Sequence, residues 1–231
     1  MDQPVVRRDL AGARVAVVGA TGALGSLLVS DLGSRGARVL AVGRDAERLA
    51  AVAAPARVVA DLGDARAGDH VAAAAREQLG GLDGLVNAAG VVAFGPLVDT
   101  PDEVLEELFF TNVVGPLFLL RRVLPLLEES QGFVVQLSAV VAEQPMPRMA
   151  AYSASKAALS AASVALRGEL RRSRVEVYDV RPPHTETGLA TRPLSGAAPR
   201  LPAGKDPAAA ARRIVEAIEA REHDLGAGAF G

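Results

Sequence analysis

The sequence predicts an α/β fold with a doubly wound parallel β-sheet of about seven strands and helices on both faces. Short apolar runs alternate along the chain with longer segments of helical spacing. This alternation is typical of βαβ units, whose parallel strands are buried on both sides. Glycine-containing or polar loops follow several of the apolar runs. Ligands in such sheets bind outside the carboxyl ends of the strands, so we expect a site there.

The predicted strands are compact apolar runs, most of which end at glycine, asparagine or aspartate. We expect strands at residues 14–19, 37–42, 57–60, 82–87, 132–138 and 174–180. The last residues, 224–231, have room for a short seventh strand, although their glycines weaken it.

The predicted helices fill the intervals between these strands. We expect helices at residues 24–35, 45–53, 67–79, 102–129, 150–172 and 207–222. Thr100 and Pro101, followed by two acidic residues, form a typical helix start. Pro116 and Pro125 interrupt the region 102–129, so we expect at least one break or kink there.

We expect a single domain over residues 1–231, because one aliphatic core suits this length and no change of composition marks a boundary. Residues 1–13 are expected to form a short tail. Residues 181–206 are rich in Pro, Gly, Thr and Ser and lack periodicity, which predicts a long functional loop. We expect this loop to form one wall of a substrate pocket.

Composition argues against several classes of function. The formal net charge is -2 without a long basic run, so neither nucleic acid nor an anionic membrane is an expected partner. The chain has no cysteine, which excludes disulfides and thiolate chemistry. Its beginning lacks an apolar signal core, and no uninterrupted apolar run reaches the roughly 18 residues that span a bilayer. We expect a cytoplasmic protein with a small-molecule substrate and no metal site.

The loop after the first strand predicts a site for a dinucleotide. Glycine lets the backbone turn tightly and approach a phosphate, and the following helix N-terminus offers free N–H groups and a positive dipole end. A simple turn is the alternative. The candidate cofactor residues of this loop are Gly19, Thr21, Gly22, Leu24 and Gly25.

The ends of the second and third strands suggest which dinucleotide binds. An acidic residue after the second strand would bind the ribose 2′-hydroxyl of NAD, but the chain has Arg44 there, and Asp45 is expected to face away. Arg44 can meet a 2′-phosphate, which favours NADP(H) over NAD(H); a solvated arginine is the alternative. Asp61 either accepts a hydrogen bond from the adenine amine or is an N-cap or turn aspartate.

Two asparagines stand near the expected site. Asn87 ends the fourth strand and can tie neighbouring strands together, while the small residues Ala88 and Gly90 let a cofactor lie against the backbone. Asn112 lies in a helical stretch, where asparagine is a poor helix former. It is therefore either functional or a break in the helix.

Tyr152 and Lys156 are four residues apart on a predicted helix, so their side chains share one face. A phenol titrates near 10, and a fixed cation beside it lowers that pKa. Such a pair makes a tuned proton donor or acceptor for a hydroxyl or carbonyl group. The alternative for this short pattern is an ordinary surface Tyr and Lys.

Taken together and in order, these pieces resemble the short-chain dehydrogenase/reductase family over nearly the whole chain. The matching segments are GATGALG, Asp61-Leu62, NAAG at 87–90, Asn112, FVVQLS, YSASK at 152–156 and RPPHTET at 181–187. The resemblance implies a Rossmann-type fold that binds a nicotinamide cofactor, and a homodimer or homotetramer paired through two long central helices.

The resemblance also implies roles for individual residues. Tyr152 would be the general acid/base, and Lys156 would lower its pKa and bind the nicotinamide ribose. Asn112 would hold a water in a proton relay. Leu62 and Pro182 fall within matching cofactor segments, and Thr185 and Thr187 match positions that meet the nicotinamide carboxamide and the pyrophosphate.

Three features depart from the family pattern. The glycines follow the spacing GxxGxxG, where classical members usually have GxxxGxG. Ala139 occupies the position of the catalytic serine, thirteen residues before Tyr152. Ser138 is one residue away and can serve only if the strand end bulges or the loop carries one extra residue, because adjacent strand residues face opposite sides. Pro183 replaces a glycine, and the following His184 is more often solvated than catalytic.

We therefore predict an NADP(H)-dependent oxidoreductase that transfers a hydride between nicotinamide and a carbonyl or secondary alcohol. Ala139 motivates an alternative, a catalytically weak NADP(H)-binding sensor or scaffold. A second alternative is redox-neutral chemistry on the same scaffold, by a dehydratase or epimerase.

Overall fold

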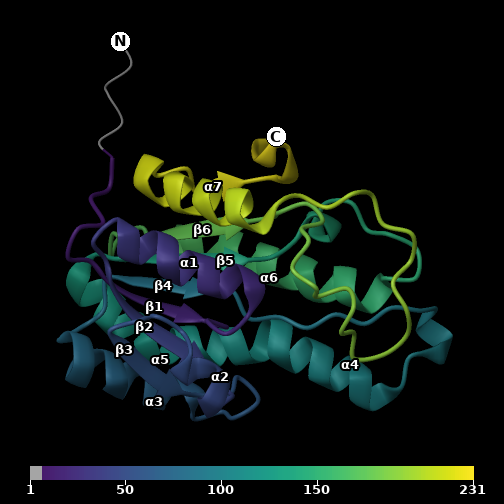
Figure 1. Cartoon of the computed structure of the whole chain (residues 1–231), viewed down its shortest axis with the longest axis horizontal. Helices are drawn as coiled ribbons and strands as arrows, with labels where there is room; N and C mark the ends of the chain where they lie inside the picture. Colours follow the sequence, from purple (N-terminus) through teal and green to yellow (C-terminus); the bar gives the residue numbers. More distant parts are fainter. Residues whose placement is uncertain (1–6) are drawn as a thin grey trace.

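The computed structural model describes residues 7–231, which form one seven-stranded, all-parallel sheet in the order β3-β2-β1-β4-β5-β6-β7 (Figure 1). Residues 1–6 of the expected tail lie outside the described residues. The strands are β1 (Arg14–Val18), β2 (Arg38–Gly43), β3 (Ala56–Val59), β4 (Gly84–Asn87), β5 (Phe133–Leu137), β6 (Glu176–Val180) and β7 (Asp224–Leu225). The predicted α/β class and the short last strand are confirmed.

Helices cover both faces of the sheet. α1 (Ala23–Ser34) and α7 (Pro207–Ala220) lie on one face, above the sheet in Figure 1. α3 (Ala67–Ala74), α5 (Gly115–Ser130) and α6 (Ala150–Glu169) pack on the other. The apolar strands serve both layers, because side chains alternate between the faces.

Alternation in β1 illustrates this division. Val15 and Val17 belong to the core beneath α1 and α7, whereas Ala16 and Val18 belong to the core beneath α3 and α5.

The remaining elements are α2 (Ala46–Ala50), α4 (Asp102–Phe109), the 3-10 turns η2 (Leu97–Asp99), η4 (Val140–Ala142) and η5 (Ala227–Phe230), and the π turns η1 (Ala75–Leu79) and η3 (Phe110–Val114).

The long helical region 102–130 is interrupted, as predicted, by the π turn η3 between α4 and α5. Pro116 follows this turn and lacks the N–H that would bond to the carbonyl of Asn112 in a regular α-helix. Pro125 is instead accommodated inside α5. By length and composition alone this 29-residue stretch could cross a membrane. In the structure, its buried leucines fill the core beside α3.

The topology creates a crevice at the carboxyl edge of the sheet. From β1 the chain moves outward to β2 and β3, then returns to β4 on the other side of β1, where Val17 pairs with both Ala41 and Val86. Loops after β1 and β4 therefore diverge at this switch point. Residues 181–206 lie at the same edge and contain no helix or strand, only an isolated bridge between Thr185 and Lys205.

Candidate active site

A cavity of about 920 Å³ opens at the carboxyl edge of the sheet and takes lining residues from the ends of six strands. Sixteen of the predicted site residues line it: Gly19, Thr21, Gly22, Leu24, Gly25, Arg44, Asp61, Leu62, Ala88, Gly90, Ser138, Tyr152, Lys156, Pro182, Thr185 and Thr187. The remaining two, Asn87 and Asn112, are buried behind its wall. One concave site therefore gathers residues that are far apart in the sequence.

The glycine loop forms one end of the cavity. Gly19 has a φ of 78°, and a Cβ at this position would lie 2.8 Å from the backbone nitrogen of Ala89. Any larger residue would be strained and would collide with the segment after β4. Gly22 begins α1 without a side-chain cap, so the first N–H groups of this helix are left to a ligand. This geometry suits a phosphate.

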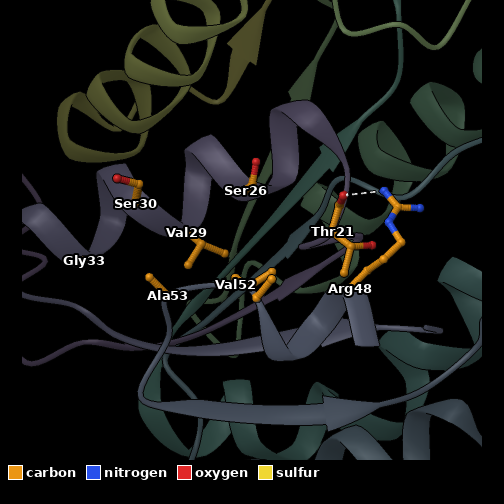
Figure 2. Close-up of a pocket in the computed structure, with 9 residues that line it drawn as sticks. Thr21, Ser26, Val29, Ser30, Gly33, Arg48, Val52 and Ala53 are labelled. Atoms are coloured by element: carbon orange, nitrogen blue, oxygen red, sulfur yellow. Dashed lines mark hydrogen bonds between the residues drawn. The ribbon is translucent and has the colours of Figure 1, made fainter. Parts of the chain in front are cut away.

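Two arginines stand beside the glycine loop. Arg44 follows β2, and Arg48, which sequence reasoning missed, projects from α2 into the same cavity. Arg48 Nη2 donates to the backbone oxygen of Thr21 at 2.8 Å, which ties α2 to the loop (Figure 2). The four-residue spacing of Arg44 and Arg48 could have indicated that both side chains reach the same cavity, although Arg44 precedes the helix.

Asp45 and Asp61 make local turns. The Asp45 carboxylate caps α2 by accepting from the Arg48 backbone N–H at 3.0 Å, as expected for a residue that faces away. Asp61 Oδ1 accepts from the Gly63 N–H at 2.9 Å, the turn that was the alternative to adenine binding. Its carboxylate still lines the cavity, so the second oxygen can meet a ligand.

The same loop and α2 also border a smaller cavity of about 550 Å³ between α1 and α2 (Figure 2). Its lining includes Val29 and Val52, and it shares Thr21 and Arg48 with the larger cavity. The hydrogen bond between these two residues therefore forms part of the partition between the spaces.

The two asparagines hold the frame of the site. Asn87 Nδ2 donates to Gln136 Oε1 at 2.8 Å, which confirms the predicted tie between neighbouring strands β4 and β5. Asn112 clamps the chain after β4: its Oδ1 accepts from the Val91 N–H, and its Nδ2 donates to the Val91 carbonyl, both at 2.9 Å. Asn112 Nδ2 also donates to Ser155 Oγ on α6 at 3.0 Å.

Tyr152 and Lys156 lie together on the cavity-facing side of α6, as their spacing predicts. Lys156 Nζ donates to the Leu137 carbonyl at 3.0 Å and lies 6.0 Å from the centroid of the Tyr152 ring. Gly90 permits this arrangement, because a Cβ there would lie 3.2 Å from Lys156 Nζ and 3.3 Å from Asn112 Oδ1.

Burial dominates the protonation of this pair. Desolvation lowers the pKa of Lys156 to about 8, opposed by the negative charge of Asp179. Desolvation also raises the pKa of Tyr152 above its ordinary value of 10.0. The predicted lowering of the Tyr152 pKa is therefore wrong for this structure, since burial outweighs the charge of a lysine 6.0 Å from the ring.

Ser138 does not take over the position of Ala139. Its backbone N–H bonds to the Val180 carbonyl at 2.9 Å, so the ladder to β6 continues without a bulge. Ser138 Oγ donates to Asp179 Oδ1 at 2.6 Å, on the side of the strand that faces α6. Ala139 instead packs against the apolar cluster that contains Tyr152. The structure therefore does not support Ser138 as the group that holds a substrate oxygen.

The rest of the cavity wall beside Tyr152 is largely apolar. Val92, Phe94, Val141 and Met149 form a buried cluster with the tyrosine. The loop 181–206 closes this side, as predicted, with the lining residues His184, Leu189, Ala190, Arg192, Leu194, Leu201 and Pro202. Thr111 and Gln144 also line the cavity, and sequence reasoning did not identify them.

Comparison with known proteins agrees with this geometry. A family model described as short chain dehydrogenase matches residues 13–195. A short chain dehydrogenase of Pseudocercospora fijiensis is 31% identical over 192 residues, 78% of this chain, and the match spans just 62% of the fungal protein. Dehydrogenase/reductase SDR family member 7B of Bos taurus is 31% identical over 245 residues, 95% of this chain and 74% of the bovine protein.

Solved structures show the same fold. A short chain dehydrogenase from Burkholderia cenocepacia, in complex with NADP, matches with a TM-score of 0.80 and 28% identity over 96% of this chain and 91% of that one. A 3-ketoacyl-(acyl-carrier-protein) reductase from Brucella melitensis, complexed with NADH, matches with a TM-score of 0.84 and 22% identity over 94% of this chain and 97% of that one. At that identity the second likeness concerns the fold alone.

Proposed function

Because this chain belongs to the short-chain dehydrogenase/reductase family of oxidoreductases, we propose that it transfers a hydride between NADP(H) and a carbonyl or secondary alcohol substrate. One observation carries the proposal: a single cavity has an uncapped helix N-terminus and two arginines at one end and the Tyr152–Lys156 pair at the other. Phosphate binding and proton transfer are thus available within one space of cofactor size.

The chain's own residues suit distinct parts of a dinucleotide. Gly19 and the N-terminus of α1 would hold the pyrophosphate, and Arg44 with Arg48 would hold a 2′-phosphate. Thr185 and Thr187 would meet the carboxamide and the pyrophosphate from the loop after β6. When bound, the nicotinamide supplies or accepts the hydride. The absence of a carboxylate facing the cavity after β2 supports NADP(H) over NAD(H).

In carbonyl reduction, Tyr152 would act as the general acid. Burial raises the pKa of its phenol above the ordinary value of 10.0, so the hydroxyl carries its proton at neutral pH. In reduction, the Tyr152 hydroxyl donates its proton to the carbonyl oxygen while the carbonyl carbon accepts hydride. Lys156, with its positive charge, then stabilises the phenolate that remains.

Ala139 favours a second candidate, an NADP(H)-binding protein with weak catalysis. The alanine offers no hydroxyl to a substrate oxygen, and Ser138 is engaged by Asp179. Tight NADPH binding without turnover of a broad panel of carbonyl compounds would favour this candidate. Product formation without a net change in cofactor absorbance would instead indicate a dehydratase or epimerase.

We also propose a cytoplasmic homodimer or homotetramer. Phe109, Phe118 and Val164 are exposed on α4, α5 and α6, so these helices carry apolar side chains that a second copy would cover. Light scattering would measure the mass of the assembly in solution.

The decisive experiment compares the two tyrosines of the chain. Tyr152→Phe removes the proposed acid and should lower kcat for NADPH-dependent reduction by about 10²- to 10⁴-fold while NADPH still binds. Tyr178→Phe is the matched control, because Tyr178 is buried in the core and its hydroxyl donates to Glu176 at 2.6 Å. Equal kcat values for the wild type and Tyr152→Phe would contradict the assignment.

A further inference from the structure

Beneath Lys156 lies a carboxylate that the proposed chemistry does not use. Asp179 follows the core residue Val177 on the same face of β6 and is 0% exposed. Its side chain lies on the face of the sheet that α6 covers. A buried carboxylate is costly unless it is paired and hydrogen-bonded, so its contacts indicate what it does.

Three side chains from three elements bind Asp179. Ser138 Oγ, at the end of β5, donates to its Oδ1 at 2.6 Å. Ser160 Oγ, on α6, donates to its Oδ2 at 2.5 Å. Arg181 Nη1, just after β6, donates to the same Oδ2. Asp179 therefore fastens α6 to the carboxyl ends of two strands.

Arg181 does not by itself explain Asp179. The guanidinium also pairs with Glu143 at the end of η4 and with Asp224 of β7. Both of these carboxylates are partly exposed, whereas Asp179 is fully buried. Glu143 and Asp224 already accept hydrogen bonds from the Arg181 guanidinium. Pairing with Arg181 alone therefore does not explain why a third carboxylate, that of Asp179, is fully buried.

The second reason is the neighbouring lysine. Ser160 follows Lys156 by one helical turn, so the bond from Ser160 to Asp179 fixes the turn that carries the lysine. On β5, Leu137 accepts from Lys156 and the next residue, Ser138, donates to Asp179. Ammonium and carboxylate are thus anchored to adjacent residues of one strand.

The groups around Lys156 come from every element packed against it. They are Tyr152 on α6, Asn112 on η3, Gly90 after β4, Leu137 on β5, and Asp179 with Arg181 behind it on β6. The charge of Asp179 raises the pKa of Lys156 against the effect of burial.

We propose that Asp179 is a positioning residue of the active site, a buried counter-charge that keeps Lys156 in its ammonium form and fixes its helix against β5 and β6. The effect on turnover rests on the proposed function. The protonation of Lys156 does not, and it can be measured without substrate or cofactor.

The chain contains two lysines, Lys156 and Lys205, which makes a direct test simple. NMR of protein labelled at the lysine side chains would give two signals, assigned with Lys205→Arg. In the wild type, Lys156 should titrate near its pKa of about 8. In Asp179→Asn, loss of the negative charge should lower that pKa by about one unit.

Ser160→Ala is the matched control, because it removes one hydrogen bond to Asp179 and leaves the charge in place. It should lower the melting temperature but leave the Lys156 titration within a few tenths of a pH unit. Should Asp179→Asn fail to fold, Asp179→Ser removes the same charge with a smaller side chain. A Lys156 titration that is unchanged in a folded variant without the Asp179 charge would overturn the proposal.

Kinetics supply a second readout. The limb of the kcat/KM profile that falls as Lys156 loses its proton should move to lower pH in Asp179→Asn and stay in place in Ser160→Ala. A uniform loss of activity with an unmoved limb would indicate a purely structural role and contradict the proposal. If the wild type turns over no carbonyl compound, the proposed function fails, while the NMR titration still decides the role of Asp179.

Discussion

Replacing Ala139 by serine should speed carbonyl reduction. The alanine lies at the end of β5 in extended backbone, with φ of -172° and ψ of 163°, and its side chain packs against the cluster that contains Tyr152. A hydroxyl added there would point toward the space beside the phenol. It would give the reacting oxygen a second donor, which neither Ala139 nor the engaged Ser138 provides.

The size of the gain follows from the energy of one such donor. A preorganised hydrogen bond to a developing oxyanion changes kcat by about 10²- to 10³-fold, or about 2.7–4 kcal/mol. A serine introduced without its own supporting contacts should recover part of this. We expect about a 10- to 100-fold rise in kcat for an unactivated ketone, and a smaller rise for an electron-poor ketone that needs less stabilisation.

The assay is NADPH oxidation with pairs of ketones that differ in electron demand but not in size. Ala142→Ser is the control, since Ala142 lies in the η4 turn that follows Ala139 but does not line the cavity. It should leave kcat within about twofold. If Ala139→Ser is no faster than the wild type, while Tyr152→Phe still lowers kcat as expected, the reacting oxygen already has a second donor and the role assigned to position 139 is wrong.

Two further predictions concern the cofactor and the lysine. Arg44→Ala should raise the KM for NADPH by about 10- to 100-fold, because one charge-assisted hydrogen bond is lost. The KM for NADH should stay nearly unchanged. Equal effects on both cofactors would exclude a contact between Arg44 and the 2′-phosphate. Gly90→Ala should lower kcat by about tenfold, because the new Cβ would lie 3.2 Å from Lys156 Nζ and displace it. A kcat equal to that of the wild type would mean that the position of Lys156 tolerates the methyl group.

Regular patterns in the sequence were sufficient to predict the sheet and the position of the site. The apolar runs that end in Gly19 and Asn87 correspond to β1 and β4, and their loops diverge at the switch point. The strand alternation also explained why Ser138 and Ala139 cannot be interchanged. These features follow from the order of apolar and polar residues along the chain, because side chains alternate between the two faces of a strand.

The effects of burial could not be predicted from the sequence. The spacing of Tyr152 and Lys156 predicted their meeting but gave the wrong direction for the tyrosine pKa, because desolvation depends on segments distant in the sequence. Arg48 and the lining of the loop 181–206 likewise depend on tertiary packing. One compositional signal was available: of 25 basic residues two are lysines, and one of these is Lys156.

The π turn at Phe110–Val114 changes the direction in which side chains point on either side of it, between α4 and α5. Each extra residue in a turn rotates everything beyond it by about 100° around the helix axis. The apolar faces of α4 and α5 therefore need not point in the same direction. α5 can orient its leucines toward α3, while the residues of the turn set the direction of Asn112 toward Val91 and Ser155 independently. The π turn thus lets α5 pack its leucines in the core while Asn112 is oriented separately toward the site.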